Sequence, residues 1–230
     1  MIIAGLQKLS LVDFPGHLAS TIFVQGCNFK CGYCFNAELI DFGKGRDLSE
    51  DQVLGSFDDW KKIIEGVVIT GGEPTVYRDL PGFIKRVRNT GLKIKLDTNG
   101  SNPAQIERLL RDRLLDYVAM DIKTSLLKYP SLTDQKNIEQ AVFESAQLIM
   151  LSTVPYEFRT TCVPTMTDEE DLRLIGKMVR GAKKYCLQQF RPQRTYDEKF
   201  QDVGVYTKED LQRFKNILEE YVEEVELRGV

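Results

Sequence analysis

The chain has 230 residues, of which 42% are hydrophobic, and 31 Lys and Arg against 34 Asp and Glu give a net charge of −3. This composition indicates a globular protein with a sizeable core, and so mild a charge does not favour nucleic acid or anionic lipid as the main partner. No apolar stretch approaches the roughly 18 residues of a membrane span, and the first ten residues lack the layout of a secretory signal. We therefore expect a cytoplasmic protein with no nucleic-acid or membrane partner.

After an irregular start, short runs rich in β-branched residues alternate with longer amphipathic segments. This alternation predicts β/α units around a parallel sheet. Several runs are apolar without interruption, as in Val67-Val68-Ile69, which is typical of strands that are covered on both faces. Six strands are expected, over residues 20–25, 66–70, 93–97, 117–123, 156–163 and 187–191.

Four expected helices begin at a residue whose side chain can accept from the first backbone N–H groups of a helix. Ser49 is followed by Gln52 in the pattern of a capping box, and Pro103 suits a first helical position. The four capping residues are Ser49, Asn102, Asp168 and Thr207. Apolar residues at helical spacing follow the last two and are expected to face the core: Leu172, Ile175, Met178, Val179, Leu211, Phe214, Ile217, Leu218 and Tyr221.

Six β/α units are two short of a closed eight-fold barrel. The expected fold class is therefore α/β, a partial (β/α)6 TIM-like barrel that is laterally open with a parallel sheet; a doubly wound open sheet is the alternative. Nothing marks a domain boundary, so we expect one domain over 1–230. It comprises an N-terminal lid or extension (1–19), the barrel core (20–192) and a C-terminal helical segment (193–230), with the site at the carboxyl ends of the strands.

Three thiols, of Cys27, Cys31 and Cys34, lie within eight residues directly after the first expected strand. Thiolates at this spacing suit zinc or iron and sulfur, but a closed tetrahedral zinc site needs a fourth ligand. Three ligands on a four-iron cluster would instead leave one iron without a protein ligand. An open coordination position of this kind is where a metal centre carries out chemistry rather than supporting structure.

The remaining ligand-type residues do not complete a closed site. His17 is the only histidine, and five cysteines are too few, and odd in number, for a disulfide scaffold. Cys162 and Cys186, in expected strand and helix-end positions, are best explained as small buried hydrophobes. The three clustered cysteines are therefore expected to act alone.

The second expected strand leads into Gly71-Gly72-Glu73-Pro74. Two adjacent glycines allow a close approach of the backbone to a ligand and a positive φ, and the proline stiffens the exit from the turn. Such a sequence on its own is most often only a turn. Its position after a strand, about forty residues beyond the cysteines, makes it a candidate part of the same site.

Polar residues also occur at the ends of the later strands, namely Asp97, Thr98, Asp121, Lys123, Arg159 and Thr161. Burying a charge without a partner is costly, so these residues require an explanation. Either Asp121 and Lys123 form a mutual ion pair or lie at exposed strand ends, or the side chains point into a site. Gln189 and Arg191 on the last strand are weaker candidates, which could pair with neighbouring acids instead.

Together, the C-x3-C-x2-C and G-G-E-P motifs resemble those of the radical S-adenosylmethionine (SAM) enzymes. The resemblance implies that Cys27, Cys31 and Cys34 bind one 4Fe-4S cluster whose free iron chelates the amino and carboxylate groups of SAM. One electron from the cluster then cleaves the sulfonium to a 5′-deoxyadenosyl radical. Catalysis would thus depend on the three cysteines through the cluster.

The same resemblance implies roles for the cofactor-binding candidates. Tyr33 and Thr161 would lie near the adenine, and backbone groups of the turn formed by Gly71, Gly72 and Glu73 would hold the methionine amino group. The remaining five residues would surround the methionine end. Asp97 and Thr98 would lie beside it, Asp121 near its amino group and Lys123 near its carboxylate, with Arg159 in a matching position on the fifth strand.

Five further stretches, over residues 5–8, 11–16, 25–28, 96–100 and 120–123, resemble the glycyl-radical-enzyme activating enzymes, in particular activating proteins of anaerobic ribonucleoside-triphosphate reductase. The resemblance runs from residue 3 to about 192. It implies that the radical removes hydrogen from a glycine of a partner glycyl radical enzyme, with a flavodoxin- or ferredoxin-type electron donor. Phe35 stands where many relatives have histidine, and no Cys-rich insert is present, so a single cluster is expected.

Two other functions are compatible with these motifs. The first is a radical SAM enzyme that acts on a small molecule, similar to 7-carboxy-7-deazaguanine synthase, because the cofactor motifs are shared. The second is a non-catalytic iron–sulfur or zinc module. The three-cysteine set and the glycine turn argue against the non-catalytic module. A measurement of SAM binding would distinguish that module from a radical SAM enzyme.

Overall fold

The computed structural model describes residues 1–43, 48–60 and 62–230. These residues form one eight-stranded sheet in the order β1-β2-β3-β4-β5-β6-β7-β8. Strands β2 to β8 run parallel to one another, and β1 pairs antiparallel with β2. The strands are β1 (Ile3–Ser10), β2 (Ala19–Val24), β3 (Gly66–Gly71), β4 (Lys93–Thr98), β5 (Tyr117–Asp121), β6 (Tyr156–Cys162), β7 (Lys184–Gln189) and β8 (Glu224–Arg228).

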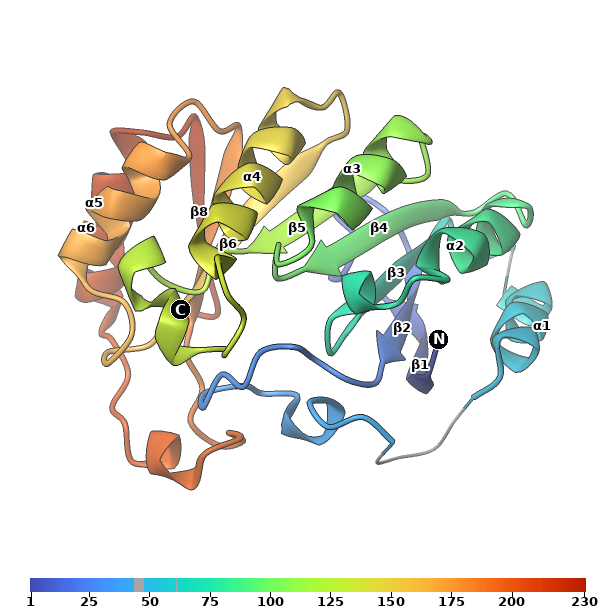
Figure 1. Ribbon diagram of the computed structural model, residues 1–230, viewed down its shortest axis with the longest axis horizontal. Helices are drawn as coiled ribbons and strands as arrows, with labels where there is room; N and C mark the ends of the chain where they lie inside the picture. The colour runs from blue at the N-terminus through green and yellow to red at the C-terminus, as the bar shows by residue number, and fades with distance from the viewer. Residues whose placement is uncertain (44–47, 61) are drawn as a thin grey trace.

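Helices follow most of the strands and lie along the outer side of the sheet, while the loop after β2 crosses its inner side (Figure 1). The α-helices are α1 (Glu50–Trp60), α2 (Leu80–Arg88), α3 (Pro103–Arg111), α4 (Ile138–Leu151), α5 (Glu169–Met178) and α6 (Lys208–Glu219). Short 3-10 helices are η1 (Ala37–Leu39), η2 (Pro74–Val76), η3 (Leu126–Ser131) and η4 (Glu198–Gln201). This is the expected α/β architecture.

All four expected helix starts are confirmed. The Ser49 hydroxyl accepts from the Gln52 N–H at 3.1 Å, and the Gln52 side chain accepts from the Ser49 N–H at 2.9 Å. The side chains of Asn102, Asp168 and Thr207 accept from the backbone N–H of the third residue of α3, α5 and α6. The helix starts could be predicted from the sequence because capping is an interaction between residues a few positions apart.

The sheet is open, since the described parts of its edge strands β1 and β8 do not pair with each other. The expectation of six strands was wrong. Residues 3–10, expected to be irregular, form β1, and the C-terminal segment contains β8 in addition to the expected helix. Both edge strands are only partly buried, so they lack the continuous apolar runs that identified the central strands. The partial barrel is nevertheless confirmed.

The two faces of β3 show how the core is divided. Val67 and Ile69 belong to the main apolar core, which includes the helices. Val68 faces the other way and packs in a smaller cluster with Phe14 and Ala19. Because side chains alternate along a strand, Val68 faces the inner side of the sheet, and this smaller cluster fills part of that side.

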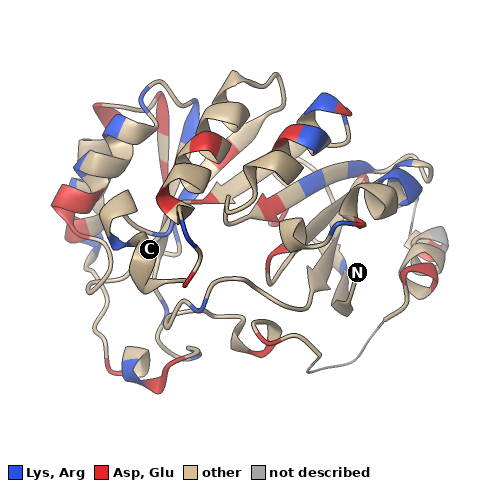
Figure 2. Cartoon of the chain, viewed as in Figure 1, with Lys and Arg blue, Asp and Glu red and all other residues tan. Residues whose placement is uncertain are grey.

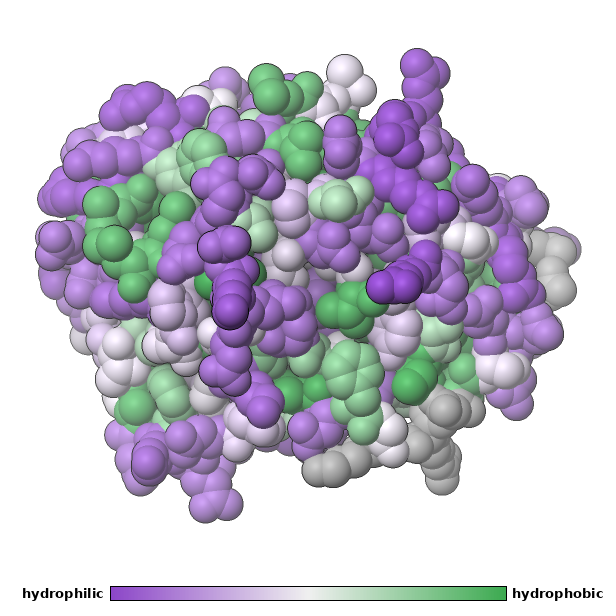
Figure 3. All heavy atoms as spheres, viewed as in Figure 1, coloured by the Kyte–Doolittle hydropathy of each residue, from purple (hydrophilic) through white to green (hydrophobic). Residues whose placement is uncertain are grey.

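Among the described residues, no helix is both long enough and apolar enough to cross a membrane. Lys and Arg are interspersed with Asp and Glu over the elements drawn in Figure 2. On the face seen in Figure 3, hydrophobic residues occur in small groups between hydrophilic ones. These views show the mixed surface that the small net charge predicts.

Candidate active site

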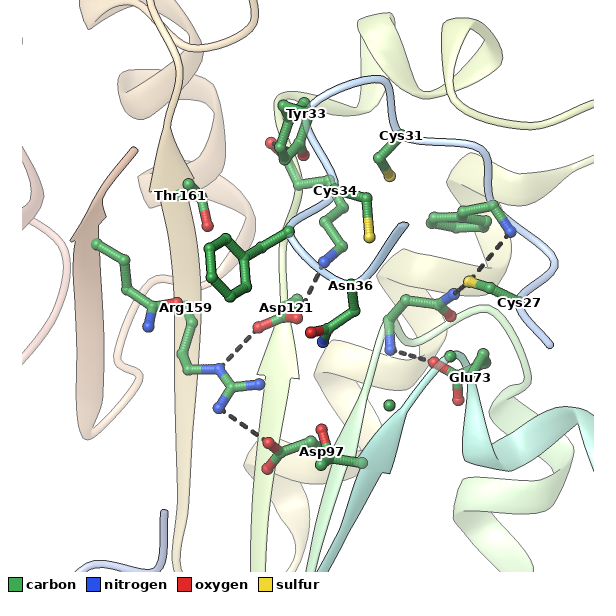
Figure 4. Close-up of a pocket in the computed structure, with 18 of the residues that line it drawn as sticks. Cys27, Cys31, Tyr33, Cys34, Asn36, Glu73, Asp97, Asp121, Arg159 and Thr161 are labelled. Atoms are coloured by element: carbon green, nitrogen blue, oxygen red, sulfur yellow. Dashed lines mark hydrogen bonds and ion pairs between the residues drawn. The ribbon is translucent and has the colours of Figure 1, made fainter. Parts of the chain in front are cut away.

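The cysteine loop, residues 27–34, begins shortly after the carboxyl end of β2. The Cys27 N–H donates to the Ile40 carbonyl oxygen at 2.9 Å, which fixes the start of the loop. The Cys34 N–H donates to the Cys31 carbonyl oxygen at 3.0 Å and closes the turn that carries the last two thiols. All the cysteines are free thiols, and the three in the loop face one cavity (Figure 4).

This cavity has a volume of ≈ 740 Å³. Its size lies within the range of about 300–1,000 Å³ that is usual for sites of small molecules and cofactors. It is lined by all 13 residues that the sequence indicated: Cys27, Cys31, Tyr33, Cys34, Gly71, Gly72, Glu73, Asp97, Thr98, Asp121, Lys123, Arg159 and Thr161. The fold therefore brings the cysteine loop, the glycine turn and the strand ends together.

The glycine turn after β3 packs directly against the backbone before the cysteine loop. The Gly72 N–H donates to the Val24 carbonyl oxygen and the Glu73 N–H to that of Gly26, both at 2.8 Å. Gly71 has φ +110°, and a Cβ there would stand 2.5 Å from the Val24 nitrogen. Glycine is thus required by both conformation and space, which explains why the turn needs this sequence.

Glu73 lines the cavity, but its carboxylate is occupied by other groups of the protein. The side chain is buried and accepts from the Thr75 N–H at 2.9 Å and the Thr75 hydroxyl at 2.5 Å. It also accepts from the Thr98 hydroxyl at 2.8 Å and the Asn99 N–H at 2.6 Å. Burial raises the pKa of Glu73, although these donors oppose the shift. The carboxylate therefore joins the end of β3 to the end of β4.

Five charged side chains from β4, β5 and β6 and their ends form a continuous network. Asp97 accepts from Lys95 at 2.6 Å and from Arg159 at 3.2 Å. Asp121 accepts from Arg159 at 2.7 Å and from Lys123 at 2.9 Å. Asp121 and Arg159 are in register across β5 and β6, so the pairing follows from the sheet. With three cations and two carboxylates, the network carries an excess positive charge that suits an anionic ligand group.

Electrostatics keeps these carboxyl groups ionised. Burial alone would raise the pKa of Asp121, but Arg159 and Lys123 hold it well below its ordinary value. Asp97 is affected in the same way, because Arg159 and Lys95 lower its pKa against the effect of burial. The two explanations of Asp121 and Lys123 thus hold together: the residues form an ion pair, and both line the cavity.

The three clustered thiols are poorly stabilised as bare thiolates. Burial raises the pKa of Cys27 to about 12 and that of Cys31 to about 11, and it also raises the pKa of Cys34. The Lys123 ammonium acts in the opposite direction on all three. Three thiols beside a cation, one buried and two half-buried, fit an iron–sulfur centre, which would stabilise their deprotonated form.

The spacing of the thiols also bears on the kind of metal centre. Within the described residues, no three His, Cys, Asp or Glu side chains lie close enough to hold a single metal ion. A mononuclear site needs its ligands around one atom, whereas a cluster binds each thiolate through a different iron. Three thiols supply one ligand fewer than a closed tetrahedral zinc site takes, and this donor set fits a cluster that keeps one iron without a protein ligand.

Tyr33 is buried and lies between the cavity and a segment that follows β7. Its hydroxyl donates to the Lys123 carbonyl oxygen at 3.4 Å, and its ring centroid is 5.9 Å from that of Phe200 in η4. The same phenyl ring covers Gly32, and the Asp197 N–H donates to the Gly32 carbonyl oxygen at 2.9 Å. The segment around η4 thus covers the outer side of the cysteine loop, which the sequence did not indicate.

The cavity contains further residues that the sequence reasoning missed. Alternation along β2 could have identified Thr21 and Phe23, since both lie on the inner face. The weaker candidates Gln189 and Arg191 also line the cavity, and Gln189 donates to the Tyr206 carbonyl oxygen at 3.0 Å rather than to an acid. The other missed lining residues include Val12, Asp13, Asn36, Thr70, Asn99 and Gln188.

Three remaining residues have clear positions. Cys162 and Cys186 are fully buried, as expected, although Cys186 lies within β7 and not at a helix end. Phe35 lines the cavity and is 53% exposed, so it lies at the rim.

Comparison with known proteins agrees with this geometry. Residues 21–177 match the family model described as the radical SAM superfamily. Among curated proteins, the chain is 33% identical to one from Methanocaldococcus jannaschii that is named as a candidate glycyl-radical enzyme activating enzyme; the match covers 100% of this chain and 96% of that protein. It is 24% identical to a pyruvate formate-lyase-activating enzyme of Clostridium pasteurianum, over 96% and 98% of the two chains.

Among solved structures, Streptococcus suis SuiB bound to the precursor peptide SuiA matches with a TM-score of 0.67 at 16% identity. The match covers 91% of this chain and 48% of SuiB, so this chain spans about half the length of that protein. At this identity the likeness concerns the fold, which is the same open barrel. From the family model and the full-length relatives, the chain belongs to the radical SAM superfamily and, within it, to the glycyl-radical-enzyme activating enzymes.

Proposed function

We propose that the chain binds one 4Fe-4S cluster through Cys27, Cys31 and Cys34, binds SAM in the adjoining cavity, and activates a partner glycyl radical enzyme. The observation that carries the proposal is the convergence of all 13 candidate residues on one cavity. The other two cysteines are buried in β6 and β7, so they support a single cluster. When bound, the cluster supplies the electron that cleaves SAM to a radical able to remove hydrogen from a glycine.

The residues of the chain bind and orient the cofactor in this proposal. Lys123, at one end of the network, and Arg159, in its middle, face the SAM carboxylate, and Asp97 and Asp121 accept from its amino group. Support comes from the ionised state of both carboxyl groups, which a cationic amino group requires. The turn at Gly71 and Gly72 provides backbone carbonyls for the same amino group.

The adenine end would lie toward Tyr33 and Thr161, and Thr98 would lie by the methionine end. Tyr33 is buried beneath Phe200, which supports a rigid wall suited to a flat ring. With these groups fixed by packing, the protein contributes binding, orientation and exclusion of water, while the cofactor carries the difficult chemistry.

A partner loop must reach the inner side of the barrel. The unpaired edges β1 and β8 leave the described sheet open laterally, which supports access by a polypeptide substrate. A glycine is a suitable target because it has no side chain to block the approach. We propose anaerobic ribonucleoside-triphosphate reductase as the partner, on the resemblance of residues 5–16 and 120–123, and a flavodoxin- or ferredoxin-type protein as the electron donor.

The decisive experiment is anaerobic electron paramagnetic resonance after incubation of reduced protein and SAM with candidate partners. A glycyl doublet is expected in anaerobic ribonucleotide reductase, and pyruvate formate-lyase is the comparison. The Cys31→Ala chain, which lacks one cluster ligand, should produce none. A doublet only in pyruvate formate-lyase would replace the proposed partner, and SAM cleavage that depends on a small molecule would favour the alternative class of enzyme.

A further inference from the structure

Asn99 follows β4 directly, and the orientation of its side-chain amide is determined by its contacts. The residue is 5% exposed. Its Oδ1 accepts from the Ser101 N–H at 2.9 Å. A backbone N–H can only donate, so this contact identifies the acceptor end of the amide. The Nδ2 group, which carries two N–H donors, therefore lies on the other side.

Asn28, in the cysteine loop, takes one of these two donors. Its Oδ1 lies 3.0 Å from Asn99 Nδ2. The orientation of Asn28 follows from this contact, because Asn99 Nδ2 can only donate and must therefore face an acceptor. The Asn28 Nδ2 then lies 2.7 Å from Ser101 Oγ and 3.1 Å from Gln135 Oε1, both of which can accept. The amide oxygen of Asn28 thus faces Asn99, which leaves the second Asn99 N–H for another acceptor.

That acceptor is the sulfur of Cys27. The distance from Asn99 Nδ2 to Cys27 Sγ is 3.9 Å, a length at which the large sulfur atom can still accept. The Phe29 N–H reaches the same sulfur at 3.4 Å. Cys27 is therefore approached by one backbone donor and one side-chain donor.

The position of Asn99 is set in turn by the glycine turn. Its backbone N–H donates to the buried Glu73 carboxylate at 2.6 Å, and Thr98 donates to the same carboxylate at 2.8 Å. Asn99 is thus held at its backbone by Glu73 and at its side-chain amide by Ser101 and Asn28. Such outer contacts orient a metal ligand and tune its electronic properties.

We propose that Asn99 is a positioning residue for Cys27 that raises the reduction potential of the cluster through an N–H···S hydrogen bond. Added negative charge on a reduced cluster is shared with its sulfur ligands, and a donor to such a sulfur stabilises the reduced state. This inference rests on the proposed function only in that it takes Cys27 as a cluster ligand.

The test is a redox titration of the anaerobically reconstituted full chain, followed by electron paramagnetic resonance, with wild type, Asn99→Ala and Asn99→Asp. In Asn99→Ala we expect retained iron and reduction that is about tenfold less favourable, a shift of about 59 mV to more negative potential for a one-electron couple. Water entering the vacated space would instead stabilise the reduced cluster and shift its potential to more positive values. The sign of the shift therefore separates loss of the hydrogen bond from entry of water.

Asn99→Asp preserves the shape and the acceptor for Ser101 but replaces the donor with a negative charge. Its shift should have the same sign and be larger, which keeps the test decisive if Asn99→Ala binds little iron. Asn102→Ala is the matched control, because the Asn102 amide donates to the Thr75 carbonyl oxygen at 2.8 Å instead, and its potential should equal that of wild type. Unchanged potentials in both Asn99 variants would overturn this inference, whereas a wild-type chain that binds no iron would overturn the proposed function.

Discussion

Gly72 and Gly26 lie in direct backbone contact: a Cβ built on Gly72 would stand 2.1 Å from the Gly26 carbonyl oxygen. Gly26 immediately precedes Cys27, so the glycine turn and the cysteine loop share one junction. The Glu73 N–H donates to the same carbonyl oxygen at 2.8 Å. A change in the turn therefore reaches the position of the first thiol.

Replacing Gly72 by alanine should disturb both cluster loop and cofactor site, because a backbone oxygen cannot move aside as a flexible side chain can. We expect a loss of about 1–3 kcal/mol in the free energy of unfolding, as for other overpacked sites, and weaker SAM binding by anaerobic calorimetry. Gly82→Ala in α2 is the control, since a Cβ there meets nothing within 4 Å. Equal affinities in the two variants would remove the role assigned to the turn.

A second contact links the cysteine loop to η4. A Cβ on Gly32 would stand 2.3 Å from the Phe200 ring. Gly32→Ala should lower the iron retained after reconstitution, because the ring must leave its place on the loop. The double variant Gly32→Ala/Phe200→Ala should retain more iron than Gly32→Ala alone. In unfolding experiments, the free-energy changes of the two single variants should differ from that of the double variant by a coupling of about 0.5–3 kcal/mol. Strictly additive effects would show that the ring does not hold the loop.

The network around Asp121 predicts a pH dependence of stability. The pKa of Asp121 in the folded chain is lowered from its ordinary 3.8, so its ionisation stabilises the fold above that pH, and this contribution is lost as the pH falls through and below 3.8. In urea titrations, the free energy of unfolding of wild type should fall more steeply on acidification than that of Asp121→Asn. Equal slopes would show that Arg159 and Lys123 do not stabilise the carboxylate.

The C-terminal strand is attached by an ion pair whose carboxylate is buried. Arg228 in β8 donates to both oxygens of the buried Glu157 carboxylate, at 2.9 and 2.8 Å. Arg228→Ala should cost about 3 kcal/mol in the free energy of unfolding because a buried charge is left without its partner. Adding Glu157→Gln should restore part of this loss by removing the charge.

Arg213 is the matched control, because its side chain is 59% exposed and its partners are surface carboxylates. Arg213→Ala should change the free energy of unfolding by at most about 1 kcal/mol. A similar cost in Arg213→Ala and Arg228→Ala would mean that β8 is not attached through Glu157.

Features that depend on residues close together in the sequence could be predicted from the sequence. The capping residues of α1, α3, α5 and α6, the central strands and the apolar helix stripes each depend on contacts within a few positions along the chain. The candidate site was predictable for the same reason. Cys27 to Cys34 and Gly71 to Glu73 are continuous motifs, and the strand-end charges stand out against apolar runs. Because the strands are parallel, their carboxyl ends meet at one edge of the sheet, so the motifs that follow them are expected to lie together.

The edge strands and the contacts across the molecule were decided by tertiary packing alone. Strand β8 comes after the helical segment α6 in the chain, and its residues form a strand only through pairing with β7 and the ion pair to Glu157. Likewise, the register of β5 with β6 joins Asp121 to Arg159, and the path after β7 places Phe200 on Gly32. Such contacts connect residues far apart in the chain, and their free energy depends on sheet order, register and close packing, which no local pattern of residue types encodes.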